Sequence, residues 1–316
     1  MKVLVTGADG FVGRHLVPRL VSRGYQVVAG CRPDFSHVNT ADTLMGEDVH
    51  LIPFELTDPD RIQAAVSPGH DIVIHLAAVS SVREAREDPG RAWLVNAAGT
   101  SRLANAVDAA RRADRTNPLV LIISTAEVYG CGTARPRLET DVPRPQSTYA
   151  ASKLGAEIAG LEVWRRTGLR VVVARPFTHT GPGQAAGFVV PSFIRRLLAI
   201  KSGDSPQVPT GNLDPIRDFL DVRDVVDAYL HLVDAGSPGE IYNVTRGEGI
   251  SLRDLFFRVA DLIGVDAEPI PDPALVRSAD IPHLVGNGGK LRDTTGWSPS
   301  TPLDQTLLDM VNAQTH

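Results

Sequence analysis

Short, continuous runs of apolar residues alternate with longer amphipathic stretches through the first 175 residues of the chain. The runs are rich in valine, isoleucine and leucine and contain little polar alternation. Strands that are apolar on both faces are typical of a parallel sheet covered by helices on both sides. The predicted strands are residues 3–5, 27–29, 51–54, 72–76, 120–123 and 171–174.

The stretches between these strands have the apolar spacing of helices that bury one face. Gly24 and Gly168 follow two of them, where a glycine often ends a helix. The alternation predicts an α/β fold, a Rossmann-type doubly wound parallel sheet. The predicted helices are residues 12–22, 61–66, 93–110 and 149–166.

After residue 175 the pattern changes, because glycine and proline become frequent and the strict alternation of strands and helices is lost. We expect residues 1–175 to form a dinucleotide-binding domain, to which residues 217–240 return. Residues 176–216 and 241–316 are expected to form a smaller C-terminal α/β lobe that binds the substrate.

The composition is that of an ordinary globular protein: of 316 residues, 43% are hydrophobic and 22% charged, which excludes disorder and coiled coil. The net charge of −5 gives no electrostatic basis for binding nucleic acid or anionic membranes. Cys31 and Cys131 are too few for a disulfide framework or a zinc cluster, so no metal is expected. The apolar N-terminal run is too short for a signal peptide, and no stretch approaches the ~18 apolar residues of a membrane span. We therefore expect a cytoplasmic protein.

The first predicted strand ends in a turn that contains Gly7, Gly10 and Gly13, with Phe11 and Val12 inside it. Glycines at these positions allow a tight turn, close approach of the backbone to a pyrophosphate, and close packing of the helix that follows. The N-terminus of that helix offers N–H donors and a positive dipole to an anion. The turn predicts a dinucleotide site, and a glycine-rich turn without a ligand is the alternative.

The end of the second predicted strand indicates which dinucleotide binds. A carboxylate there binds the ribose 2′-hydroxyl of NAD, whereas an arginine accommodates the 2′-phosphate of NADP. This chain has Arg32 in that region, which favours NADP. Asp34 lies nearby and leaves NAD open, and Arg32 as a solvated loop residue is the other alternative.

Tyr149 and Lys153 lie four residues apart on a predicted helix and therefore share one face. A phenol has a pKa of about 10, and a neighbouring ammonium lowers it, so that such a pair can move a proton near neutral pH. Thr125 follows a predicted strand, where its hydroxyl can hold the reacting oxygen. An amphipathic surface pair is the alternative for Tyr149 and Lys153.

Four motifs lie in the first half: residues 6–13, His-Leu-Ala-Ala at 75–78, Ser-Thr-Ala-Glu-Val-Tyr-Gly at 124–130, and Tyr149 with Lys153. Through them the chain resembles the extended short-chain dehydrogenase/reductase superfamily of nucleotide-sugar epimerases, dehydratases and reductases. Within it the chain is most similar to the GDP-4-keto-6-deoxy-D-mannose reductases of GDP-rhamnose synthesis. That similarity lies in residues 175–184, 187–192, 211–219 and 277–282.

The resemblance implies reduction of the C4 ketone of a GDP-linked 4-keto-6-deoxyhexose by hydride from a nicotinamide. Tyr149 would donate the proton, Lys153 would bind the nicotinamide ribose, and Thr125 would bind the carbonyl oxygen. Glu127 lies where related dehydratases keep a base. Those dehydratases usually have a hydroxyl or carboxyl residue before it, and Ala126 here favours the reductase. A 4-epimerase or a 4,6-dehydratase without net cofactor turnover stays the alternative.

The resemblance also implies the remaining contacts. Those to the cofactor are Gly7, Gly10, Phe11, Val12, Gly13, Arg32, Glu55, Leu56, Leu76, Ala77, Ala78, Asn96, Tyr149, Lys153 and Pro176. Those to the substrate are Ser80, Thr178, His179, Val189, Val190, Arg217 and Arg277, with the two arginines on the diphosphate. Thr178 replaces the asparagine usual in the family, and His179 can equally be a loop residue. The resemblance further implies a homodimer through the helices at 93–110 and 149–166.

Overall fold

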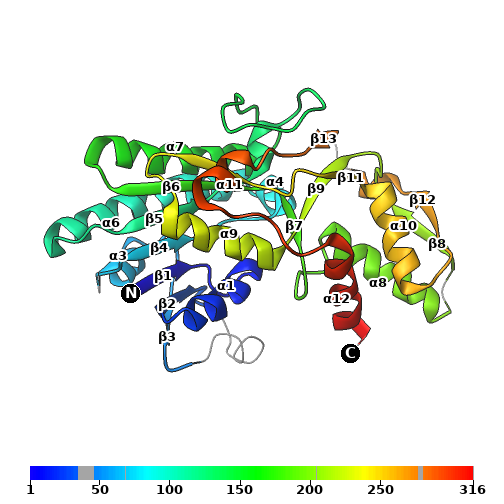
Figure 1. Cartoon of the computed structure of the whole chain (residues 1–316), viewed down its shortest axis with the longest axis horizontal. Helices are drawn as coiled ribbons and strands as arrows, with labels where there is room; N and C mark the ends of the chain where they lie inside the picture. Colours follow the sequence, from blue (N-terminus) through cyan, green and yellow to red (C-terminus); the bar gives the residue numbers. More distant parts are fainter. Residues whose placement is uncertain (35–45, 68, 204, 277–279, 316) are drawn as a thin grey trace.

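A seven-stranded parallel sheet forms the larger part of the molecule (Figure 1). The structure is a computed structural model that describes residues 1–34, 46–67, 69–203, 205–276 and 280–315. The strand order is β10-β6-β5-β4-β1-β2-β3. The strands are β1 (Lys2–Thr6), β2 (Gln26–Cys31), β3 (Val49–Pro53), β4 (Ile72–His75), β5 (Leu119–Ile123), β6 (Arg170–Pro176) and β10 (Ile241–Val244).

Helices cover both faces of this sheet, because successive strand residues point to opposite sides and both sides are apolar. Val3 and Val5 of β1 belong to the core beneath one helical layer, and Leu4 belongs to the core beneath the other. The first layer contains α1 (Phe11–Ser22), α9 (Val222–Ala235) and α11 (Gly289–Thr295); the second contains α3 (Pro59–Val66), α6 (Thr100–Asp114) and α7 (Thr148–Thr167). The predicted doubly wound fold is confirmed.

The helix predicted at residues 93–110 is longer and is divided into three parts. It starts earlier, because the Asp88 carboxylate caps the amide of Arg91 at the start of α5 (Pro89–Trp93). A π-helical turn, η1 (Leu94–Gly99), then joins α5 to α6. Apolar spacing does not reveal such a widened turn, which places Asn96 in the interior and is often associated with functional sites.

Helix α4 (Val82–Glu87) packs against α5 and α7 of the first lobe. Most of the other elements form the second lobe, seen on the right of Figure 1. In its four-stranded sheet β9 pairs with β7, β11 and β13, and the strands β8 and β12 form a separate pair. Phe193, Phe256 and Leu307 lie in its core between three helices. The elements are β7 (Thr178–Thr180), α8 (Val189–Lys201), β8 (Gln207–Thr210), β9 (Ile216–Asp221), β11 (Gly249–Ser251), α10 (Leu252–Ile263), β12 (Glu268–Pro271), β13 (His283–Leu284) and α12 (Leu303–Thr315).

The chain crosses between the two lobes more than once. Strand β9 pairs within the small sheet, whereas β10 pairs with β6 at the edge of the large sheet. Helix α11 packs against α9 and β10. Of the segment at 217–240 for which a return is predicted, α9 packs on the large sheet. We propose to place α9, β10 and α11 with the first lobe, and β9 with the second.

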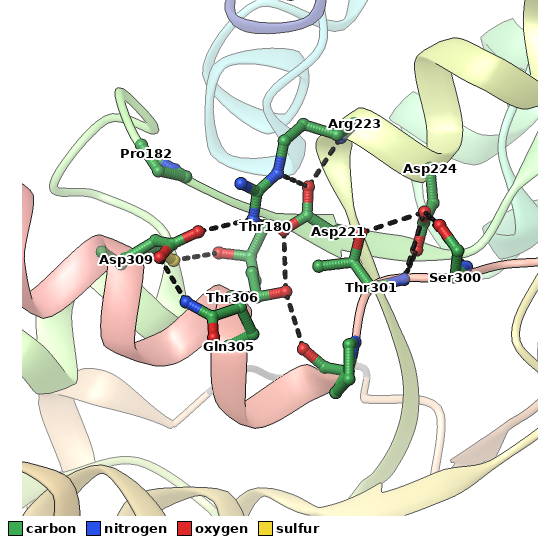
Figure 2. A network of polar contacts seen from close by, with 12 residues as sticks. Thr180, Pro182, Asp221, Arg223, Asp224, Ser300, Thr301, Gln305, Thr306 and Asp309 are labelled. Atoms are coloured by element: carbon green, nitrogen blue, oxygen red, sulfur yellow. Dashed lines mark hydrogen bonds and ion pairs between the residues drawn. The ribbon is translucent and has the colours of Figure 1, made fainter.

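A polar network fastens the C-terminal helix α12 to the start of α9 (Figure 2). The buried Asp221 carboxylate accepts hydrogen bonds from Arg223 and, at 2.8 Å, from the Thr306 hydroxyl. Arg223 also forms a 2.7 Å ion pair with Asp309 of α12. The hydroxyl of Thr180 contacts the sulfur of Met310, so α12 lies beside the strand that carries His179.

Among the described residues, none of the helices combines the length and the apolar character that crossing a lipid bilayer requires.

Candidate active site

The glycine turn forms a cradle at the N-terminus of α1. A Cβ atom on Gly13 would lie 2.4 Å from the Ala8 carbonyl oxygen, and one on Gly7, whose φ is +72°, would lie 2.8 Å from the Ala77 nitrogen. Side chains are therefore excluded at both positions. Gly10 provides no side-chain cap, so the helix N-terminus faces an incoming group with its backbone amides. This arrangement fits the pyrophosphate of a dinucleotide.

Arg32 lies just after β2 and is held beside this turn by Asp9. Its Nε donates a 2.7 Å hydrogen bond to Asp9 Oδ2, and this contact raises the pKa of the guanidinium. The Asp9 side chain is 3% exposed and that of Arg32 is 72% exposed, so the arginine extends from a buried anchor into solvent. The geometry fits an arginine that offers its remaining N–H groups to a phosphate. Nothing in the sequence pattern singles out Asp9, although it lies within the glycine turn.

Tyr149 and Thr125 meet at the carboxyl ends of the strands. Thr125 follows β5 and caps the short helix η2 (Ala126–Tyr129), and it lies close enough to Tyr149, in the first turn of α7, to act on the pKa of the phenol. Burial and the Glu127 carboxylate raise the pKa of Tyr149, while the Thr125 side chain acts in the opposite direction. The sequence argument predicts a lowering by Lys153, but the pKa of Tyr149 is set by desolvation, Glu127 and Thr125. The phenol is therefore protonated at neutral pH and able to donate its proton.

Lys153 lies one turn further along α7 and is buried. Removal of its ammonium from water lowers its pKa to about 8, although the nearby Glu157 carboxylate acts in the opposite direction. The pKa of Lys153 therefore lies close to neutral pH. The structure thus gathers Thr125, Tyr149 and Lys153 on two adjoining elements, the end of β5 and the start of α7.

A chain of buried hydrogen bonds runs from the glycine turn to α7. His75 at the end of β4 contacts the Thr6 hydroxyl at 2.7 Å and the Thr100 hydroxyl at 3.0 Å. Burial lowers its pKa to about 3, with the Lys153 charge acting the same way, so it is a neutral core histidine. Asn96 bonds the backbone of Val79 and donates to the Ser152 hydroxyl at 2.9 Å.

The other predicted cofactor residues lie along the carboxyl ends of the strands. Leu76, Ala77 and Ala78 follow β4, and the Ala77 amide donates to the Thr6 hydroxyl. Glu55 is half-buried and accepts from the Thr57 amide. Leu56 packs in the core against Gly99, which leaves its backbone for any ligand contact. Pro176 ends β6, and Phe11 and Val12 start α1.

His179 joins the two lobes. Its ring stacks on that of Phe11 from the glycine turn, with centroids 6.2 Å apart and planes within 2°. Its Nδ1 lies 3.0 Å from the Phe177 carbonyl oxygen, and burial lowers its pKa. His15 contacts the carbonyl of Pro182 nearby, a link between lobes that no sequence motif indicates. His179 therefore faces the cofactor turn.

The remaining predicted substrate residues come from separate short elements. Thr178 starts β7, Val189 and Val190 start α8, and Ser80 is exposed after β4. Arg217 of β9 forms a 2.5 Å ion pair with Asp280 and donates to the Ile281 carbonyl. Arg277 lies outside the described residues. The structure thus places Arg217 beside Asp280, a partner that the sequence pattern does not identify.

Comparisons with known proteins give the family of the chain. The model of the family described as GDP-mannose 4,6 dehydratase matches residues 4–310. The chain belongs to this family. The resemblance to the extended short-chain dehydrogenase/reductases is thereby confirmed, and the chain is an enzyme of the nucleotide-sugar reductase, dehydratase and epimerase group.

Curated relatives of different activities cover nearly the whole chain. A GDP-6-deoxy-D-mannose reductase of Pseudomonas aeruginosa is 36% identical over 97% of this chain and 94% of its own length. A UDP-glucose 4-epimerase of Mycolicibacterium smegmatis is 32% identical over 98% of this chain and 97% of its own. The family therefore includes both reductases and epimerases at this similarity.

Solved structures that cover nearly the whole chain likewise include a protein complexed with NADPH and an epimerase. RMD from Pseudomonas aeruginosa complexed with NADPH has a TM-score of 0.83 and 34% identity, covering 99% of this chain and 98% of its own. The UDP-glucose 4-epimerase of Thermotoga maritima with UDP-glucose has a TM-score of 0.89 and 27% identity, covering 100% and 99%.

Proposed function

We propose that this enzyme reduces the C4 ketone of a GDP-linked 4-keto-6-deoxyhexose with NADPH. The observation that carries the proposal is the placement of Thr125 and Tyr149 at the carboxyl ends of the strands, where η2, capped by Thr125, packs against α7, whose first turn carries Tyr149. Ketone reduction requires a proton donor at the carbonyl oxygen, and a phenol is protonated at neutral pH yet more acidic than the alcohol that forms. The reductase relative from Pseudomonas aeruginosa supports the same direction.

Each residue has a role in this reaction. When bound, the dihydronicotinamide supplies the hydride to C4. Thr125 donates a hydrogen bond to the carbonyl oxygen, Tyr149 transfers its proton to that oxygen as the C=O π bond breaks, and the buried Lys153 ammonium stabilises the resulting phenolate. The alcohol, phenolate and NADP⁺ balance the ketone, phenol and NADPH, and solvent returns the proton to Tyr149.

NADPH is favoured over NADH by Arg32, whose exposed guanidinium is anchored to Asp9 beside the glycine turn. The NADPH complex of the Pseudomonas aeruginosa structure supports this choice. On the substrate side, Arg217 would bind the diphosphate, where its fork matches two phosphate oxygens.

The test is to incubate the protein with GDP-4-keto-6-deoxymannose and NADPH and to follow absorbance and product. A reductase consumes one NADPH for each 4-hydroxyl formed. The epimerase relatives favour a second candidate, a 4-epimerase or 4,6-dehydratase, which would convert a GDP-hexose without net consumption of NADPH. The buried methyl group of Ala126, before Glu127, supports the reductase, because a hydroxyl or carboxyl group is usual there in the dehydratases.

We also propose a homodimer that forms through the helices at residues 93–110 and 149–166. Trp93, Leu94 and Ile158 are 46%, 42% and 60% exposed, and they lie on α5, η1 and α7, which pack side by side. Such neighbouring exposed apolar side chains are typical of an interface. Light scattering should give twice the chain mass, and Ile158→Glu should give the monomer; a monomeric wild type would contradict the proposal.

A further inference from the structure

Glu157 is a buried carboxylate that the proposed reaction does not use. It lies one turn after Lys153 on α7 and shares its face of the helix, and its side chain is 2% exposed. A charge so well removed from water requires partners.

Its partners come from two strands of the large sheet. Arg175 of β6 binds it with both prongs, Nε to Oε1 at 2.9 Å and Nη2 to Oε2 at 2.7 Å. Ser124, which follows β5, donates its hydroxyl to the same Oε1. The guanidinium of Arg175 also lies over the ring of Tyr129, 4.8 Å from its centroid.

These contacts connect the elements that deliver the catalytic groups. Ser124 directly precedes Thr125, and α7 carries Tyr149 and Lys153. Replacing a buried ion pair by apolar side chains is often neutral or stabilising, so stability alone is a weak reason for this pair.

We propose that Glu157 is a positioning residue, which keeps the Lys153 ammonium charged and fixes α7 against the ends of β5 and β6. The inference rests on the proposed function for the role of Lys153 in catalysis, but not for the coupling between the two side chains.

The surroundings of Lys153 support this. Tyr149 lies on the same helix with a neutral phenol, and His75 on β4 is neutral because its pKa is about 3. Arg175 on β6 carries a positive charge that Glu157 neutralises. Burial lowers the pKa of Lys153 to about 8 and Glu157 acts to raise it. Loss of the carboxylate therefore lowers the pKa further and leaves less ammonium at neutral pH.

The first experiment measures the coupling without substrate or cofactor. A double-mutant cycle of Glu157→Gln and Lys153→Met is run by urea unfolding at pH 7 and at pH 10. The loss of the Arg175 partner occurs in both arms and cancels. We expect a favourable coupling at pH 7, where Lys153 is largely charged, and little at pH 10, above its pKa. Equal coupling at both pH values, or none at either, would overturn the proposal.

The second experiment records the pH dependence of kcat. In Glu157→Gln the alkaline limb should move down by about one pH unit, because Lys153 loses its proton earlier. Arg175→Met is the matched control: it breaks the same ion pair but removes a positive charge, so its limb should stay or move up. A merely structural role predicts the same lower rate at every pH in both variants.

The double variant Glu157→Gln with Arg175→Met leaves no unpaired charge and serves if Glu157→Gln alone fails to fold. This double variant is compared with Arg175→Met, and each is studied with and without Lys153→Met. The free energy of unfolding of these four proteins is measured as a function of pH, which repeats the cycle. If the coupling is found and the ketone is not reduced, the proposed function is wrong while the role of Glu157 in charging Lys153 stands.

Discussion

The two sides of the candidate site are built differently. The catalytic wall, which we define as Thr125, Tyr149 and Lys153, comes from one strand end and one helix, and a buried carboxylate backs it. The substrate wall, defined as Thr178, His179, Val189, Val190 and Arg217, comes from β7, α8 and β9 of the second lobe.

Their polar groups are also held differently. On the catalytic wall Thr125 is fixed as the cap of η2, and Tyr149 and Lys153 lie on one helix that packs against η2. On the substrate wall Arg217 is held by Asp280, and His179 by Phe177 and by its stacking on Phe11. The comparison indicates that the catalytic side chains are positioned within the first lobe. Substrate affinity depends on how the second lobe is placed against it.

The largest effect is expected on the catalytic wall. Tyr149→Phe removes the proton donor and should lower kcat by about 10²–10⁴-fold, because that is the usual contribution of a positioned acid. Steady-state kinetics measures this, and the thermal midpoint should stay near that of the wild type, because only the hydroxyl is lost. Unaltered turnover would show that another group supplies the proton.

A smaller effect is expected on the substrate wall, and it should appear in KM. Arg217→Met removes a charged fork from the diphosphate and should raise KM for the nucleotide sugar by roughly 10–100-fold, since hydrogen bonds to charged groups contribute about 1.5–3 kcal/mol. Arg253→Met, whose arginine pairs with exposed Asp214, is the control and should leave KM unchanged. If both variants changed KM equally, Arg217 would not belong to the substrate site.

The cofactor side should show a selective change. Arg32→Ala should raise KM for NADPH about tenfold and leave KM for NADH nearly unchanged, because only NADPH carries the 2′-phosphate. Arg61→Ala, at an arginine paired with Asp58 on α3, is the control. If KM rose equally for NADPH and NADH, Arg32 would support the glycine turn and would not bind the 2′-phosphate.

The smallest effect concerns the attachment of α12 to the start of α9. Thr306→Val removes the hydrogen bond to Asp221 and should lower the free energy of unfolding by about 1 kcal/mol in urea denaturation. Thr315→Val, near the free end of the same helix, should change it little. If the decrease in kcat, converted to free energy, exceeded the loss in the free energy of unfolding, the attachment would not be purely structural.

This loss should depend on pH. Burial acts against it, but hydrogen bonds from Arg223 and Thr306 lower the pKa of Asp221 below its ordinary value. A lowered carboxyl pKa contributes stability above its unfolded value, near pH 4, and this is lost as the pH falls through the folded pKa. The difference between wild type and Thr306→Val should therefore shrink in acid.

Most of the first lobe followed from the sequence, because local patterns decide it. Continuous apolar runs predict strands buried on both faces, and the spacing of Gly7, Gly10 and Gly13 reflects backbone contacts that any Cβ would block. Tyr149 and Lys153 share a face because of their spacing on one helix.

Only the tertiary structure decided what lies next to what across the chain. The pairs of Asp9 with Arg32, of Glu157 with Arg175 and of Arg217 with Asp280 join residues that are 23, 18 and 63 positions apart. Likewise, the raised pKa of Tyr149 results from desolvation and from a carboxylate on another element. Periodicity reports the face of an element, whereas burial and charge at a point depend on every element that packs there, and the protonation of the site is set by these.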